Sequence, residues 1–229
     1  MCITCGCHPK TISLEEKILQ KNDQLAAKNR VFFHDNNLLT LNLLSSPGSG
    51  KTTLLEKTLQ TLLTFQHCYV IEGDQHTDQD VIRIRATGAE AIQINTGKGC
   101  HLDAHHIVHG IEKLPLNSKG GYLFIENVGN LVCPASFDLG EDKKIVILSV
   151  TEGDDKPIKY PDMFHAADLM IINKIDLLPY VNFDIATCIN HAHHINPSLE
   201  VIELSATTSD GMETWIHYLK KLSRKIKFS

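Results

Sequence analysis

The stretch LTLNLLSSPGSGKT at positions 39–52 decides the fold. It joins an apolar segment, expected to be a strand over 39–46, to a helical pattern over 51–65 through a loop rich in glycine and serine. A glycine-rich loop between a strand and a helix presents backbone N–H groups and the helix N-terminus to phosphate groups. The sequence therefore predicts a phosphate-binding loop, in which Ser45 replaces the usual first glycine.

The residue types in this loop predict the contacts that it makes. Gly48 and Gly50 allow the backbone to approach phosphates closely. Lys51 is expected to reach the β- and γ-phosphates, and Thr52 to ligate Mg²⁺. The full set of expected nucleotide contacts here is Pro47, Gly48, Ser49, Gly50, Lys51, Thr52 and Thr53.

Outward from this loop, short apolar strands alternate with helical stretches. We expect strands over 39–46, 68–73, 91–95, 122–128, 144–150, 169–173 and 201–206, with helices over 51–65, 78–86, 102–114, 183–195 and from Met212 onward. Nearly continuous apolar strands alternating with helices predict an α/β fold, a mostly parallel sheet with helices on both faces. The strands over 122–128 and 144–150 follow each other closely, so we expect them to be neighbours in the sheet. Ligands of such sheets bind at the carboxyl ends of the strands.

Length and composition limit the classes of protein that fit. The 229 residues suit one domain with extra elements, here a Cys-rich leader over 1–10, a helix over 11–35 and a main domain over 36–229. Hydrophobic residues make up 42% and charged residues 21%, which excludes disorder and collagen-like repeats. The net charge of -5 gives no footprint for nucleic acid. The sequence has no membrane-spanning run and no signal-peptide core, so we expect a cytoplasmic protein.

A second motif predicts the base of the nucleotide. Asn173-Lys174-Ile175-Asp176 follows the strand over 169–173. A carboxylate there accepts hydrogen bonds from the N1–H and 2-amino groups of guanine, which adenine does not offer, and rejecting adenine leaves a buried charge unpaired. Ser205-Ala206, at the end of the next strand, fits the loop that contacts the guanine oxygen. The sequence therefore indicates a GTP-binding site.

Two acidic residues at other strand ends complete the expected nucleotide site. Asp74 and Glu126 are candidates for Mg²⁺ coordination, directly or through water, and Asp74 is also a candidate for positioning the attacking water. The alternative roles are a helix cap for Asp74 and a turn for Glu126. Gly129 is expected to supply a backbone N–H near the γ-phosphate. The predicted catalytic residues of a Mg²⁺-dependent GTPase are thus Lys51, Asp74 and Glu126.

The N-terminal leader carries Cys2, Cys5 and Cys7 within six positions. Cysteines so close together in a reducing compartment are more often metal ligands or redox groups than disulfides. Three thiolates, with a terminal amine as a further ligand, suit Ni²⁺ in a planar arrangement and Zn²⁺ in a tetrahedral one. The alternative is an incidental reactive tail.

Cys100-His101 and Cys133 form a second predicted metal cluster. The pair follows the strand over 91–95, and Cys133 comes seven residues after Glu126, so both segments reach the edge of the sheet where the nucleotide is expected. A Cys/His/Cys set leaves one coordination position open for solvent or another subunit. Buried inert cysteines are the alternative, and this is how we interpret Cys68 and Cys188, which fall within apolar patterns.

Histidines recur every four residues at His101, His105 and His109. On a helix this spacing places three imidazoles on one face, which is a candidate auxiliary metal site. A solvated helix face explains the same pattern without a metal.

The motifs taken together resemble HypB, the family of nickel-insertion GTPases of NiFe-hydrogenase maturation. The matching strings include the MCxxCGC start, SSPGSGKTTLL, EGDQHT, NTGKGCHLDA, FIENVGNLVCPASFDLGE, VTEGDDKPIKYP, NKIDLLPY and LSATTSDGM. The resemblance implies a SIMIBI-like P-loop GTPase fold, a GTP-dependent homodimer, a HypA-type nickel chaperone as partner and delivery to the hydrogenase large-subunit precursor. By position, it makes Cys2, Cys5 and Cys7 a tight nickel site, and Cys100, His101 and Cys133 a site for nickel or zinc near the dimer interface.

The chain departs from some family members in one respect, because Pro9 leads almost directly into the first expected helix without a His-rich insert. Bulk nickel storage and partner docking on such an insert are therefore not expected. Two other functions remain open at this point. A metal-buffering protein with a vestigial nucleotide site would hydrolyse no GTP, and a related GTPase would serve urease or a cobalamin enzyme. The intact Lys51, Thr52, Asp74 and Asp176 argue against the first, and the cysteine motifs against the second.

Overall fold

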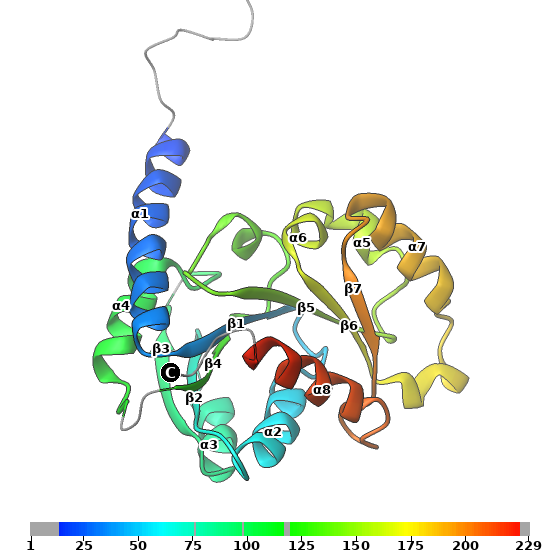
Figure 1. Cartoon of the computed structure of the whole chain (residues 1–229). Coiled ribbons are helices and arrows are strands. Elements are labelled where there is room, and N and C mark those ends of the chain that lie inside the picture. Colours follow the sequence, from blue (N-terminus) through cyan, green and yellow to red (C-terminus); the bar gives the residue numbers. More distant parts are fainter. Residues whose placement is uncertain (1–13, 76, 98, 117–119, 225–229) are drawn as a thin grey trace, which may run out of the picture.

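The computed structural model describes residues 14–224 except 76, 98 and 117–119. In this part of the chain seven strands form one sheet in the order β3-β2-β4-β1-β5-β6-β7, and every adjacent pair is parallel (Figure 1). The strands are β1 (Leu38–Ser45), β2 (Cys68–Asp74), β3 (Glu90–Asn95), β4 (Gly121–Glu126), β5 (Lys143–Ser149), β6 (Leu169–Asn173) and β7 (Glu200–Glu203).

Helices cover both faces of the sheet (Figure 1). The α-helices are α1 (Leu14–Asp35), α2 (Lys51–Leu62), α3 (Gln79–Ala86), α4 (Ala104–Lys113), α5 (Lys156–Lys159), α6 (Pro161–Ala166), α7 (Ile185–Ile195) and α8 (Met212–Ser223), and short 3₁₀ helices are η1 (Cys133–Ser136) and η2 (Ile175–Tyr180). Among the described residues, no helix combines the length and apolarity needed to cross a membrane.

Apolar burial on both faces explains why the strands are nearly continuous hydrophobic runs. Side chains of α2, α3 and α8 pack against one face, where Trp215 is 1% exposed and donates to the Thr58 hydroxyl at 2.8 Å. Side chains of α1, α4, α6 and α7 cover the other face in two clusters. All eight residues of β1 are buried, as expected for a strand at the centre of a covered parallel sheet.

The predicted mostly parallel sheet covered by helices is confirmed, but one expected strand neighbour is wrong. β4 and β5, which correspond to the segments expected at 122–128 and 144–150, are not adjacent, because β1 lies between them and pairs with both. Closeness in sequence does not decide adjacency here. β1 is buried along its whole length at the centre of the sheet, and the connection over 127–142 carries the chain from β4 past β1 to β5.

Helix α1 is attached to the domain by two buried asparagines. The Asn29 amide donates to the carbonyl groups of Ala104 and Leu139 at 3.0 and 3.1 Å. Asn22 accepts a hydrogen bond from the Ala104 N–H at 2.9 Å and donates to the carbonyl of Asp138 at 2.8 Å. These contacts hold the start of α4 against the segment that follows η1. Cys100 and His101 precede the start of α4, and Cys133 begins η1. Helix α1 therefore helps to fix the predicted metal cluster.

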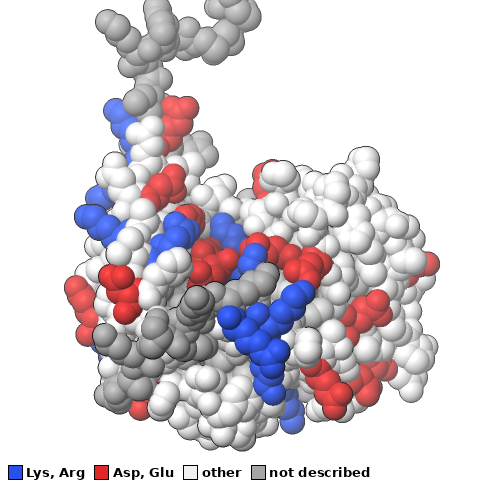
Figure 2. All heavy atoms as spheres, viewed as in Figure 1, with Lys and Arg blue, Asp and Glu red and all other residues white. Residues whose placement is uncertain are grey.

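The N-terminal half of α1 projects from the domain (Figure 1). Leu14 and Ile18 are 75% and 51% exposed, and Figure 2 shows charges of both signs interspersed along this helix. The Cys-rich leader over 1–10, with Cys2, Cys5 and Cys7, lies outside the described residues.

Replacing Asn29 by alanine should lower the free energy of unfolding by about 1–3 kcal/mol, because two buried carbonyl groups lose their donor. Urea denaturation measures the change. Gln24→Ala, on the exposed side of the same helix, is the matched control and should change stability by less than about 0.5 kcal/mol. Equal effects of the two substitutions would show that the asparagine contacts do not hold α1 in place.

Candidate functional site

The loop between β1 and α2 has the geometry of a phosphate-binding loop. Gly48 and Gly50 adopt left-handed backbone conformations, with φ of 78° and 92°. At Gly50 a Cβ atom would lie 2.6 Å from the amide nitrogen of Asn173, so a side chain has no room there. The loop borders a cavity of about 600 Å³, whose lining is Ser45, Ser46, Pro47, Gly48, Ser49, Gly50, Lys51, Thr52, Thr53, Asp74, Gln75, Asp80, Arg83, Val128, Gly129 and Lys174.

Lys51 and Thr52 meet the end of β4 at the base of this cavity. The Thr52 hydroxyl donates to the Glu126 carboxylate at 2.6 Å, and the Lys51 ammonium lies 3.5 Å from the same oxygen. Burial raises the pKa of Glu126 above its usual range, while Lys51 and Thr52 oppose the shift. The second carboxylate oxygen of Glu126 is buried without a hydrogen-bond partner. A hydroxyl, an ammonium and a partly unpaired carboxylate suit a phosphate with its divalent cation.

Asp74 also lines the cavity, but its carboxylate holds its own loop together. It accepts hydrogen bonds from the Gln75 N–H at 2.6 Å, the Thr77 N–H at 3.0 Å and the Thr77 hydroxyl at 2.8 Å. Asp74 therefore lies near the phosphate-binding loop, as expected. It also accepts local backbone hydrogen bonds, as the alternative capping role requires. Any Mg²⁺-binding or water-positioning role of Asp74 stays a prediction.

Two charged residues of the cavity lining were missed by the sequence analysis. Asp80 and Arg83 lie on α3, and Arg83 forms ion pairs with Glu56 at 2.6 Å and with Asp80 at 3.3 Å. Arg83 also donates to the Thr53 hydroxyl at 3.1 Å. Charged residues on a short amphipathic helix are typical of a solvated face, so the sequence gives no signal that these two border the cavity.

The predicted base-recognition segment is tied directly to the phosphate-binding loop. The Asn173 amide donates to the carbonyl of Ser49 at 2.9 Å, and the Lys174 ammonium donates to the carbonyl of Gly48 at 2.6 Å. The Asn173 oxygen also accepts a hydrogen bond from the Ala206 N–H at 3.1 Å. The carboxyl end of β6 thereby joins the phosphate-binding loop to the loop after β7.

Asp176, Ser205 and Ala206 lie around this junction rather than in the lining of the cavity itself. One carboxylate oxygen of Asp176 is buried without a hydrogen-bond partner, as a group that awaits donors would be. Ser205 is fully buried and its hydroxyl accepts a hydrogen bond from the Thr208 N–H at 3.1 Å, which shapes the loop after β7. The residues predicted to bind guanine thus lie at two neighbouring strand ends.

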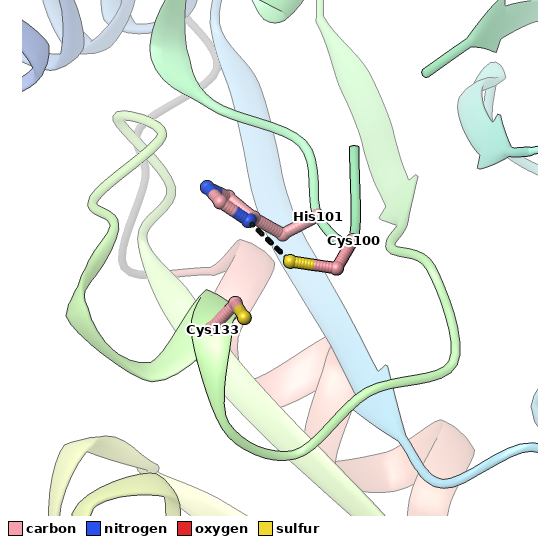
Figure 3. A group of neighbouring side chains, drawn as sticks. All are labelled: Cys100, His101 and Cys133. Atoms are coloured by element: carbon pink, nitrogen blue, oxygen red, sulfur yellow. Dashed lines mark hydrogen bonds between the residues drawn. The ribbon is translucent and has the colours of Figure 1, made fainter. Parts of the chain in front are cut away.

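Cys100, His101 and Cys133 converge from two different loops (Figure 3). Their possible ligand atoms all lie within 4.8 Å of one another, and the Cys100 sulfur is 3.4 Å from His101 Nδ1. Cys133 begins η1 and approaches the pair from the segment that follows β4. Two sulfurs and one nitrogen so arranged can hold a thiophilic divalent cation. In the described part of the chain, this is the one group of three such ligands close enough to share an ion.

Local contacts set the protonation of this cluster. The neighbouring Cys133 sulfur and partial burial raise the pKa of the Cys100 thiol, and burial lowers the pKa of His101. The His101 ring packs against Phe137 with ring centres 4.1 Å apart, which fixes its orientation. A neutral imidazole is ready to bind a metal, whereas the thiols must lose protons to do so. Cys68 and Cys188, predicted to be core residues, are 2% and 0% exposed, which confirms that prediction.

The prediction that three histidines share one helix face is wrong for His101. Helix α4 begins at Ala104 rather than near 102, because Asp103 caps it and accepts a hydrogen bond from the His106 N–H at 2.8 Å. His101 therefore precedes the helix and turns toward Cys100. His105 and His109 do share a helix face, with ring centres 4.5 Å apart, and metal binding by this pair stays a prediction.

Asn127 links the cavity to the cysteine cluster, and sequence reasoning missed it. Its carbonyl oxygen accepts a hydrogen bond from the Lys51 ammonium at 2.5 Å, and its side-chain oxygen accepts one from the Leu102 N–H at 3.0 Å. Asn130 adds a second tie by donating to the carbonyl of Cys100 at 3.1 Å. An asparagine just after a strand is typical of a turn, so only its 1% exposure in the fold shows its structural role.

Comparison with known proteins identifies the family to which this arrangement belongs. A model of the CobW/HypB/UreG nucleotide-binding domain matches residues 39–203. Hydrogenase maturation factor HypB of Azotobacter vinelandii is 58% identical over 212 residues, which cover 93% of this chain and 70% of that protein. The chain belongs to the HypB family. This confirms the resemblance noted from the motifs.

Solved structures of the HypB family agree with this fold. The crystal structure of HypB from Helicobacter pylori in complex with nickel matches with a TM-score of 0.84 and 40% identity, covering 90% of this chain and 96% of that one. HypB from Archaeoglobus fulgidus matches with a TM-score of 0.83 and 41% identity, covering 89% and 99%. The α/β P-loop GTPase fold predicted from the sequence is therefore confirmed.

Gly50→Ala should destabilise the domain more than Gly97→Ala. Both glycines are left-handed, which costs an L-residue about 1–2 kcal/mol, but Gly97 has open space around it, whereas a Cβ at Gly50 would collide with Asn173. We expect an additional loss of about 1–3 kcal/mol at Gly50, measured by urea unfolding. Equal losses for the two variants would contradict the close packing of Asn173 on the phosphate-binding loop.

Proposed function

We propose that this chain is a Mg²⁺-dependent GTPase and metallochaperone that binds nickel and delivers it to the hydrogenase large-subunit precursor. One observation carries the proposal. Asn127 contacts both Lys51 in the phosphate-binding loop and the backbone next to the Cys100–His101–Cys133 cluster. A nucleotide site and a metal site that share one rigid turn suit a protein that links nucleotide hydrolysis to metal transfer. Membership of the HypB family supports the same conclusion.

The nucleotide chemistry rests on residues around the cavity. In the proposal, Lys51 binds the β- and γ-phosphates, Gly129 supplies a backbone N–H near the γ-phosphate, and Asp74 positions the attacking water. Thr52, Asp74 and Glu126 would hold Mg²⁺, which neutralises charge on the phosphates when bound. The unpartnered oxygen of Glu126 supports this assignment because a buried carboxylate without a donor is suited to a cation.

Guanine is the proposed base because of Asp176. Its buried carboxylate oxygen lacks a hydrogen-bond donor, and guanine offers two donors where adenine offers none in the same arrangement. Asn173 and Lys174 hold the phosphate-binding loop against this segment, so both ends of one nucleotide would be fixed by the same strand end. Ser205 and Ala206 complete the pocket around the base.

Two metal sites are proposed. Cys2, Cys5 and Cys7 of the leader would form the tight nickel site, and Cys100, His101 and Cys133 would hold nickel or zinc. The second set offers three ligands, so solvent or a second subunit would complete the coordination. A GTP-dependent homodimer, a HypA-type nickel chaperone and the hydrogenase large-subunit precursor are the proposed partners, in the cytoplasm. The nickel complex of the Helicobacter pylori relative supports nickel as cargo.

Single-turnover hydrolysis of GTP tests the enzymatic part, since a metal buffer with a vestigial nucleotide site would release no phosphate.

The Asp176→Asn substitution tests whether Asp176 recognises the guanine base. It should weaken GTP binding by about 1–3 kcal/mol and reduce selectivity over ATP, because the amide cannot accept from both guanine donors. Asp162→Asn, an exposed aspartate on α6, is the matched control and should leave both affinities unchanged. Unchanged selectivity in the Asp176 variant would mean that the base is bound elsewhere.

Deletion of residues 1–7 should abolish the tightest nickel binding and leave GTP hydrolysis intact, because the leader cysteines precede the GTPase domain. Equilibrium dialysis of Ni²⁺ against a competing chelator measures the loss. Cys133→Ala in the full chain is the converse control, expected to retain the tightest site and to lose the weaker one. Tight nickel binding by the truncated chain would remove the leader from the proposal.

A further inference from the structure

Glu72 is a buried carboxylate for which the proposed GTPase reaction has no role. It lies in the middle of β2, is 2% exposed, and one of its carboxylate oxygens has no hydrogen-bond partner. A charged side chain is costly in the interior unless it is paired or bound to a metal. Its buried position after the apolar residues Cys68 to Ile71 of β2 therefore calls for a partner.

Strand register places Glu72 beside Glu126. The two are Cα partners in the parallel pair of β2 and β4, so their side chains project from the same face of the sheet. Glu126 contacts the Thr52 hydroxyl of α2, which identifies that face as the one below the phosphate-binding loop. On the opposite face, a Cβ at the next residue, Gly73, would meet Leu102. Both glutamates therefore face the base of the cavity.

The surroundings of Glu72 are dominated by negative charge. Glu126 is its Cα partner in the sheet, Asp74 follows it by two residues on β2, and Asp80 lines the cavity, whereas the nearby cation is Lys51. Lys51 is already shared with Glu126 at 3.5 Å and with the carbonyl of Asn127. One ammonium group cannot neutralise this set of carboxylates, and both Glu72 and Glu126 retain an oxygen without a partner. A divalent cation supplies the missing positive charge.

We propose that Glu72 and Glu126 form a two-carboxylate site for the divalent cation of the nucleotide, in which Glu72 raises the affinity for the cation. The inference rests on the proposed GTP-binding function and adds a residue to it. Mg²⁺ prefers charged oxygen ligands. When a nucleotide supplies phosphate oxygens, a few protein carboxylates are enough to hold the cation. Glu72 thus sets how much Mg²⁺ the nucleotide complex requires.

Glu72→Gln in the full chain tests this role, since glutamine preserves the shape of the side chain and removes the charge. Binding of a fluorescent GDP is titrated with Mg²⁺, and Mn²⁺ affinity of the GDP complex is measured by the paramagnetic resonance signal of free Mn²⁺. We expect the variant to need at least about tenfold more Mg²⁺ to reach half of the Mg²⁺-dependent change in GDP binding. It should also bind Mn²⁺ correspondingly more weakly. GDP affinity in EDTA should stay within about twofold of wild type, because Glu72 would act on the cation.

Glu141→Gln is the matched control, because Glu141 is also a buried carboxylate, 8% exposed, but its oxygens accept hydrogen bonds from the Asn42 amide and the Leu139 N–H. It should leave cation dependence unchanged. Glu72→Asp keeps the charge, so its cation dependence should lie between those of wild type and Glu72→Gln. This variant also allows the test if the glutamine variant does not fold. Wild-type cation dependence in either Glu72 variant, or equal loss of GDP affinity with and without cation, would overturn the role of Glu72. Absence of any GDP binding by wild type would instead overturn the proposed function.

Discussion

The buried turn at Asn127 is the constraint on which both candidate sites depend. Its backbone carbonyl fixes the Lys51 ammonium, and its side chain fixes the backbone at Leu102, just after Cys100 and His101. The same side chain donates to Asn42 on β1 at 3.4 Å, so the turn is anchored to the central strand. Because a buried amide with satisfied partners has few alternative arrangements, we expect movement at the phosphates to change the position of the loop that carries Cys100 and His101.

The all-parallel sheet creates this proximity. Strands β1, β2 and β4 are neighbours that end at one edge, which brings together the phosphate-binding loop, Asp74 and Glu126. The loop after β4 then continues to Cys133, so one segment contributes to the cavity and to the cysteine cluster. Helix α1 holds the far side of the cluster through Asn22 and Asn29. The proposed coupling of hydrolysis and metal transfer follows from this single edge.

The predictable parts of this molecule are those encoded by local patterns. Apolar runs and the glycine-rich loop predicted the strands, the helix after the loop and the cavity residues from Pro47 to Thr53, and short spacings predicted that Cys100 and His101 act together. Strand order was not predictable, since β1 gains its central position from long-range packing. Asn127 and Glu72 were missed because the sequence does not reveal which polar side chain becomes buried, although a charge within the apolar strand CYVIEG was a signal.

The central claim, that the nucleotide cavity and the Cys100–His101–Cys133 cluster are coupled, is tested most directly by one measurement. Nickel affinity is compared in the GDP-bound and GTP-analogue-bound states of a variant in which serine replaces Cys2, Cys5 and Cys7. We predict affinities that differ about tenfold, which needs coupling of only about 1.4 kcal/mol, with an equal reciprocal effect of nickel on nucleotide affinity. Equal nickel affinities in both nucleotide states would contradict the account and leave the cluster as a static metal site.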